Sequence, residues 1–265
     1  MGGAGPLEGK AALVVGGGTG IGAACARRLA QEGVAVAVMG RRRELVGEVA
    51  SSIGGLAITG DASDMVDAGK AAALVVSEYG GLDMLVASAG GHDVGAALEV
   101  SDESWQQSLD ANLNSAFVTA RACLPHLIQR QGTIVVISSI AGLVAGRDVC
   151  GYTTTKHGLI GLTRSLARDY GPRGVRVNAV CPGWVRTPMA DEELAVLQER
   201  HGLSLDEAYR LVTRDVPLGR AAEADEIAAV CRFLVSDEAS IVTGAVITAD
   251  GGSTIVDVPT LAFGD

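Results

Sequence analysis

A tyrosine and a lysine stand four residues apart in the chain, at Tyr152 and Lys156. On a helix this spacing places both side chains on one face. A free phenol has a pKa of about 10, so it stays protonated at neutral pH unless a nearby ammonium favours the phenolate. Such a pair could act as a general acid and base, although the same spacing also arises often by chance.

Ser139 precedes this tyrosine by thirteen residues and follows the apolar run 133–138. A serine at a strand end, beside the tyrosine, could donate a hydrogen bond to a carbonyl oxygen as negative charge develops there. The three residues together indicate proton transfer at a carbonyl or an alcohol.

A glycine-rich turn lies between the first apolar run and the first amphipathic segment. Glycines permit a tight turn and a close approach of a pyrophosphate, and the following helix N-terminus offers N–H groups and a positive dipole end. Any tight turn could use such a string, but its position after a strand and before a helix favours a dinucleotide site. The residues expected to contact the phosphates are Gly16, Gly18, Thr19, Gly20, Ile21 and Gly22.

Apolar runs alternate with amphipathic segments along the whole chain. Because the runs are apolar on both sides, they suit a parallel sheet covered on both faces. We therefore expect an α/β fold, a single Rossmann-like doubly wound parallel sheet of about seven strands with helices on both faces. The expected strands are 11–15, 34–39, 56–59, 83–88, 133–138, 175–180 and 245–248. The expected helices are 20–32, 42–52, 64–79, 102–130, 152–170, 191–214 and 223–236.

No linker divides the chain, so we expect one dinucleotide-binding and catalytic domain over residues 1–265. Residues 1–8 have neither a basic start nor an apolar stretch, which indicates a flexible leader instead of a signal peptide. The charged helical segment 186–215 stands where such a fold carries a substrate lid. Its apolar stripe is explained by packing as well as by recognition.

Composition argues against several classes of partner. The net charge is −10, and no basic run is longer than residues 41–43, so a nucleic-acid surface is not expected. The five cysteines lack paired spacing, as in a reducing compartment, and they form no metal pattern with the histidines. No apolar run approaches the roughly 18 residues of a membrane span. We expect a cytoplasmic protein without a metal.

The spacing Gly16-x-x-x-Gly20-x-Gly22, with the serine, tyrosine and lysine downstream, resembles the short-chain dehydrogenase/reductase family, in its 3-oxoacyl-reductase-like branch. The resemblance covers roughly residues 9–253. Two details differ from the family pattern: Val15 replaces a threonine, and residues 87–90 read Ala-Ser-Ala-Gly where the family usually has Asn-Asn-Ala-Gly. Both differences remove bracing side chains and keep the backbone donors.

The resemblance implies reversible carbonyl reduction or alcohol oxidation, with Tyr152 as general acid/base assisted by Ser139 and Lys156. It also implies that Asn112 links the lysine to solvent through a water. Asn114 competes for this role, but the pattern Asn-Leu-x-x-x-Phe favours Asn112. An asparagine inside a long helix tends to bend it or to hold water.

The second strand points to the choice of nicotinamide cofactor. NAD-binding relatives carry an acid about 20 residues after the glycines, which accepts from the ribose hydroxyls. Here that strand ends in Gly40, and Arg41 and Arg42 follow. Arginines suit a 2′-phosphate through charge-assisted hydrogen bonds, so we predict NADP(H), with NAD(H) as the alternative. The competing interpretation is that the arginines simply open an exposed helix.

Further cofactor contacts are implied by the resemblance alone. Asp61 and Ala62 match an adenine-binding position, although a strand-end turn would also explain the acid. The others are a close backbone approach at Ala89 and Gly90, the ribose contacts of Tyr152 and Lys156, and the carboxamide turn with Pro182, Gly183, Val185 and Thr187.

The substrate itself stays open between a 3-oxoacyl thioester, a steroid-like ketone, a sugar and a small cyclic alcohol. A loop histidine such as His92 is often solvent-facing, whereas Val149 and Trp184 suit apolar cleft walls. The candidate substrate contacts are His92, Val149, Trp184 and Met189. The family also implies a homotetramer through helices 102–130 and 152–170. The alternative functions are an NAD(H)-dependent alcohol dehydrogenase of the same fold and a non-catalytic nicotinamide-binding sensor.

Overall fold

The computed structural model describes residues 7–92 and 94–263, and within them the main sheet has seven strands. Their order is β3-β2-β1-β4-β5-β6-β9, and every neighbouring pair is parallel. The predicted α/β class is confirmed. The strands are β1 (Ala11–Val15), β2 (Ala35–Gly40), β3 (Leu56–Thr59), β4 (Met84–Ala87), β5 (Thr133–Ile137), β6 (Arg176–Pro182) and β9 (Val246–Ala249).

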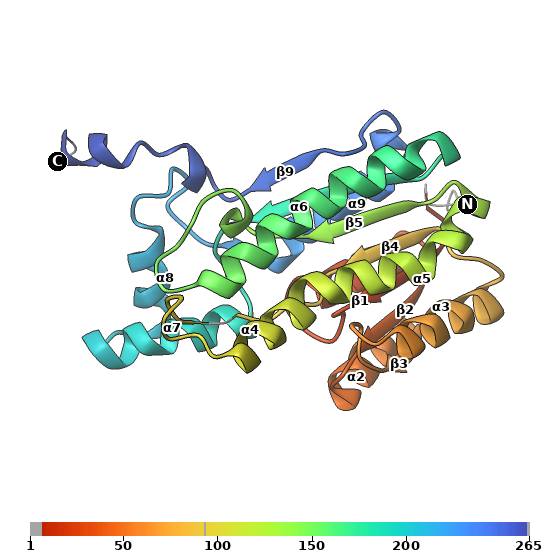
Figure 1. The fold of residues 1–265 in the computed structure, drawn as a ribbon, viewed down its shortest axis with the longest axis horizontal. Helices are drawn as coiled ribbons and strands as arrows, with labels where there is room; N and C mark the ends of the chain where they lie inside the picture. Colours follow the sequence, from red (N-terminus) through yellow and green to blue (C-terminus); the bar gives the residue numbers. More distant parts are fainter. Residues whose placement is uncertain (1–6, 93, 264–265) are drawn as a thin grey trace.

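Helices cover both faces of the sheet. Along β1, Ala12 and Val14 join a core formed with α1, α2 and α9, whereas Leu13 and Val15 join a second core formed with α3, α5 and α6. In Figure 1, α5 and α6 cross in front of the strands and α9 lies behind them. These helices are α1 (Gly20–Gln31), α2 (Arg43–Ile53), α3 (Met65–Tyr79), α5 (Ser115–Arg130), α6 (Cys150–Tyr170) and α9 (Ala224–Val235).

The winding of the chain reverses beside β1, which pairs with β2 on one side and with β4 on the other. In an open parallel sheet, ligands bind outside the carboxyl ends of the strands at this switch point. The glycine turn after β1, the loop after β4, Ser139 after β5 and the turn after β6 all lie at that edge. Figure 1 shows α7 and α8 at the same end, toward which the arrows point.

The predicted helix 102–130 is helical throughout, but its winding changes in the middle. It consists of α4 (Asp102–Ser108), a π-helical segment (Leu109–Asn114) and α5. The expected helix 191–214, by contrast, is two helices, α7 (Pro188–His201) and α8 (Leu205–Thr213). Gly202 ends α7 with a φ of 66°, and Ser204 with Glu207 forms a capping box that starts α8. Local capping signals therefore override the single apolar stripe in this segment.

Two boundaries also differ from expectation. Arg186, at the start of the expected helical lid, instead lies in the short strand β7 (Val185–Arg186), which pairs with β8 (Ala222–Glu223). Leu7, expected in the flexible leader, is 1% exposed and packs in the core with α1 and α9. Removing this apolar side chain from water stabilises the buried position relative to a mobile, solvent-exposed one. Residues 1–6 of the predicted leader lie outside the described residues.

Candidate active site

The predicted acid–base residues lie together at the start of α6. Tyr152 and Lys156 are one turn apart, and the Lys156 Nζ lies 5.4 Å from the centroid of the tyrosine ring. The Ser139 side chain hydrogen-bonds with that of Tyr152. Lys156 is only 5% exposed, and its Nζ donates to the carbonyl of Ile137 at 3.2 Å. The end of β5 thus fixes both the serine and the lysine.

Burial acts on both titrating groups. It raises the pKa of Tyr152, the Ser139 hydrogen bond lowers it by less, and the negative charge of Glu193 raises it further. Burial also lowers the pKa of Lys156 to about 8, with a smaller opposing effect of Cys181. At neutral pH the phenol is therefore protonated and the lysine mostly charged.

Asn112 lies in the π-helical segment and is 1% exposed. Its Nδ2 donates to the carbonyls of Ser108 at 3.1 Å and of Gly91 at 3.0 Å, and its Oδ1 accepts from the Gly91 N–H at 3.2 Å. A Cβ added at Gly90 would lie 3.0 Å from the asparagine Oδ1 and 3.5 Å from the Lys156 Nζ. Asn112 therefore fastens the loop after β4 close to the lysine.

The glycine turn is built for close backbone contact. Gly16 has a φ of 72°, and a Cβ there would lie 2.5 Å from the Ala89 nitrogen. A Cβ at Gly22 would overlap the carbonyl oxygen of Gly16. Thr19 is the N-cap of α1, and its side chain makes no capping bond, so the first-turn N–H groups need another partner. This concave backbone and the helix N-terminus fit a pyrophosphate.

The arginines adjoin the glycine turn. An Nη of Arg42 donates to the Thr19 Oγ1 at 3.1 Å, and Arg41 is close enough to Asp61 to lower its pKa. Partial burial raises the pKa of that carboxyl, but hydrogen bonds from Ser63 outweigh it. The Asp61 Oδ1 accepts from the Ser63 N–H at 2.8 Å and hydroxyl at 2.7 Å, which accounts for the acid as part of a turn.

The turn after β6 reaches the glycine turn through Thr187. A Cβ at Gly20 would lie 3.2 Å from the Thr187 Cγ2. The Thr187 hydroxyl donates to the Val185 carbonyl at 3.3 Å and caps α7 by accepting from Ala190. Gly183 in turn donates to the carbonyl of Ala249 on β9. The predicted carboxamide turn, including buried Pro182, therefore borders the predicted phosphate site.

The four residues predicted to contact the substrate lie in different surroundings in the structure. The His92 ring meets the Tyr152 ring edge-on, with centroids 5.2 Å apart. Val149 forms a bridge with Gly95 and precedes α6, whereas Met189 is 39% exposed on α7. Trp184 packs against the cluster that joins α7 to α8, so it supports this pair of helices.

Glu193 is a residue that sequence reasoning missed. Its Oε1 lies 3.7 Å from the His92 Nδ1, and its charge acts on Tyr152. It follows Asp191 and Glu192, and composition does not tell which of the three acids faces His92; the Asp191 Oδ1 accepts instead from the hydroxyl of buried Tyr209 at 2.7 Å. Its spacing from the buried Ala190, three residues before it, is the one signal that places it on the packed face of α7.

A family model described as enoyl-(acyl carrier protein) reductase matches residues 16–254. Curated relatives align over nearly the whole chain. The chain belongs to the short-chain dehydrogenase/reductase family. These oxidoreductases act on alcohols and ketones.

Three similar proteins illustrate the range of this family. Protein MoaE of Klebsiella aerogenes is 49% identical, over 96% of this chain and 99% of its own length. Meso-2,3-butanediol dehydrogenase of Serratia marcescens is 34% identical, over 95% and 97%. A variant of actinorhodin polyketide ketoreductase, solved with NADPH, superposes with a TM-score of 0.87 at 33% identity, over 92% and 96%.

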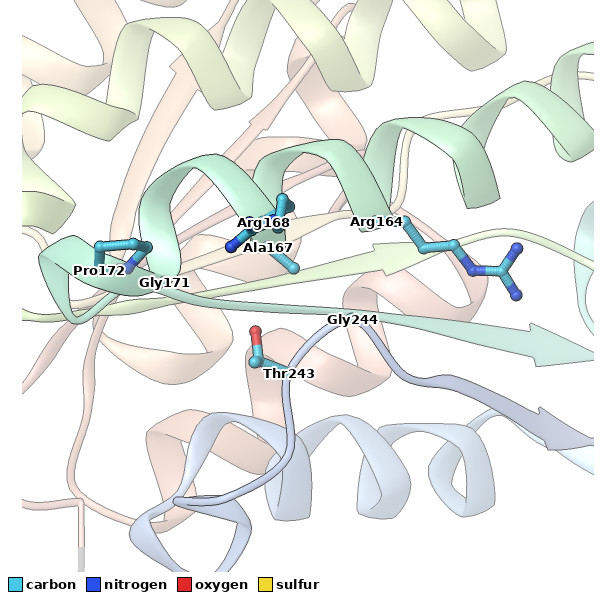
Figure 2. A pocket seen from close by; sticks show the side chains of 7 residues that line it. All are labelled: Arg164, Ala167, Arg168, Gly171, Pro172, Thr243 and Gly244. Carbon is cyan, nitrogen blue, oxygen red and sulfur yellow. The ribbon is translucent and has the colours of Figure 1, made fainter.

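In this dehydrogenase/reductase, two surface hollows lie away from the tyrosine. One, of about 380 Å³, is formed by the carboxyl end of α6 and the loop before β9 (Figure 2). The other adjoins the end of α5.

Among residues 7–92 and 94–263, no helix is both long and apolar enough to cross a membrane. Within the same residues, no three histidine, cysteine or acidic side chains gather as metal ligands do.

Proposed function

We propose that the protein catalyses the reversible reduction of a carbonyl compound to a secondary alcohol with NADP(H), and that Tyr152 is the general acid/base. The carrying observation is the cluster of half-buried Tyr152 and Ser139 with buried Lys156, at the same sheet edge as the glycine turn. A non-catalytic sensor would have no use for a lysine buried beside a tyrosine, because burying an ammonium is costly.

In the reducing direction the cluster supplies a proton. The Ser139 hydroxyl donates a hydrogen bond to the carbonyl oxygen and stabilises the charge that develops there. The Tyr152 O–H bond breaks as the alcohol O–H forms, and the Lys156 ammonium stabilises the phenolate that remains. A bound nicotinamide supplies the hydride in this direction and accepts it in the other.

Lys156 and Asn112 would help to restore the proton that Tyr152 has lost. With its pKa lowered to about 8, Lys156 can lose and regain a proton near neutral pH. Asn112 holds the loop at Gly91 next to the lysine, where a bridging water would connect the ammonium to solvent. Both residues would thus act on the substrate only through Tyr152.

The cofactor would lie along the sheet edge. The glycine turn would hold the pyrophosphate, and Arg41 and Arg42 would hold a 2′-phosphate, which supports NADP(H) over NAD(H). Asp61 with Ala62, the backbone at 89–90 and the turn at 182–187 would line the remainder. The NADPH bound to the similar ketoreductase supports the same choice.

We also propose a cytoplasmic homotetramer with a lid over residues 186–215. Phe117 is 42% exposed on α5 with the Arg121 guanidinium stacked 5.0 Å from its ring centroid, an apolar surface that suits a subunit contact. Sedimentation or light scattering of the purified protein would measure the oligomeric state.

The deciding experiment is an assay of purified protein against a panel of ketones and alcohols with NADPH, NADH and their oxidised forms. We expect turnover, with higher kcat/KM for NADP(H). Cofactor binding without turnover of any carbonyl would favour the sensor, and equal efficiency with both cofactors would contradict the arginine assignment.

A further inference from the structure

A histidine and a glutamate from distant parts of the chain meet beside Tyr152. His92 comes from the loop after β4, and Glu193 comes from the second turn of α7. The Nδ1 to Oε1 distance of 3.7 Å is longer than a hydrogen bond. The two groups are therefore in long contact, and a polar group lying beside both of them could hydrogen-bond to each.

The pair adjoins the position of the reacting oxygen. The rings of His92 and Tyr152 are 5.2 Å apart in an edge-on arrangement, and the tyrosine experiences the charge of Glu193. A substrate whose carbonyl accepts from Tyr152 and Ser139 must place its neighbouring carbon close to these side chains. Polar atoms on that carbon would be within their reach.

Packing does not explain the carboxylate. On the same face of α7, Ala190 is 7% exposed and Leu194 is 1% exposed, whereas the Glu193 side chain is 24% exposed. Burial raises the pKa of Glu193 to about 7, so an apolar residue would cost less there. Acids held in such costly positions near a reacting group are commonly functional.

We propose that Glu193 and His92 bind a hydroxyl group on the carbon next to the reacting carbonyl. The substrates would then be α-hydroxy ketones and, in the reverse direction, vicinal diols. Glu193 accepts from the substrate hydroxyl, and His92, whose Nδ1 lies 3.7 Å from the Glu193 Oε1, provides the second contact. A substrate carboxylate in the same place meets a like charge. This inference rests on the proposed carbonyl reduction and names its substrate class.

The test compares three ketones of similar size: 3-hydroxybutan-2-one, butan-2-one and 3-oxobutanoate, each with NADPH and with NADH. For the wild type we expect kcat/KM to be highest for the hydroxy ketone, by about tenfold or more over butan-2-one, and lowest for 3-oxobutanoate. Glu193→Ala should remove the preference for the hydroxyl. His92→Phe keeps a ring against Tyr152 and should reduce the same preference.

Glu192→Ala is the matched control, because Glu192 is the exposed neighbour on the same helix. It should retain the wild-type ratios. Equal loss on all three ketones in Glu193→Ala, or an unchanged ratio, would overturn the proposal in favour of a structural role. A wild type that reduces none of the three, or any other carbonyl, would overturn the proposed function as well. Turnover without a preference would overturn this inference alone.

Discussion

At the scale of single residues, Tyr152 is subject to opposing influences. Burial and the charge of Glu193 raise the pKa of its phenol, whereas the Ser139 hydrogen bond lowers it. Such a balance suits a group that must both donate and accept within one catalytic cycle.

Removing the phenolic hydroxyl should abolish most turnover. We expect Tyr152→Phe to lower kcat by about 10²–10⁴-fold, the contribution typical of general acid–base catalysis. Because the ring remains, cofactor affinity measured by fluorescence titration should change little. Wild-type turnover in this variant would contradict the assigned role.

The charge of Glu193 should set the pH dependence of alcohol oxidation. A negative charge disfavours the phenolate, so Glu193→Gln should lower the pKa of Tyr152. Oxidation requires the deprotonated tyrosine, and the rising limb of its kcat/KM against pH should therefore move to lower pH. An unchanged limb, or one moved to higher pH, would count against this coupling.

At the scale of elements, the glycine turn is packed so closely that Gly16 and Gly22 have no room for a side chain. Gly22 contacts the carbonyl of Gly16 across the turn, whereas Gly47, within α2, has no atom within 4 Å of an added Cβ. The two glycines therefore form a matched pair for substitution.

We expect Gly22→Ala to reduce the free energy of unfolding by about 1–3 kcal/mol, as overpacking does, and to weaken nucleotide binding. Gly47→Ala should be neutral or stabilising by up to about 1 kcal/mol, since alanine favours a helix. Urea unfolding with and without nucleotide measures both. Equal behaviour of the two variants would argue against a packed turn.

The sequence predicted the sheet well because its strands are continuous apolar runs with Gly-rich ends. The helix at 102–130 was less predictable. Asn112 bonds both within its own helix, to Ser108, and outside it, to Gly91, and this bridging role accompanies a π-helical segment. Periodicity carries no information about such a tertiary bond.

In the candidate site, too, some residues could be predicted from the sequence and others depend on tertiary contacts. The residues at strand ends and helix starts, such as Ser139 and Thr187, followed from spacing and from family resemblance. Glu193 did not, because which of the three acids faces His92 depends on where the loop carrying His92 lies. That placement is a property of the assembled sheet edge.

At the scale of the whole molecule, cofactor binding should stabilise the fold. A ligand at about 100 times its Kd adds about 2.7 kcal/mol, which raises Tm by roughly 5–10 °C in a chain of this size. We expect a larger shift with NADPH than with NADH at equal concentration, measured by differential scanning fluorimetry.

The double variant Arg41→Ala/Arg42→Ala should weaken NADPH binding by about tenfold or more and leave NADH binding nearly unchanged. Arg43→Ala, one residue further on, is the control and should behave as the wild type. A loss of both nucleotides in the double variant would instead indicate damage to the turn that Arg42 joins through Thr19.

The contact between α1 and α9 affects how the chain folds on the ribosome. Arg232 of α9 bonds to Glu32, just after α1, across 200 residues of sequence. During synthesis the apolar side of α1, with Ala23 and Leu29, emerges about 200 residues before α9, whose Leu234 lies in the same core. That side of α1 stays without α9 until those residues are made, a period in which exposed apolar surface favours aggregation. Expression at reduced temperature, or with chaperones that shield nascent chains, should therefore raise the soluble yield.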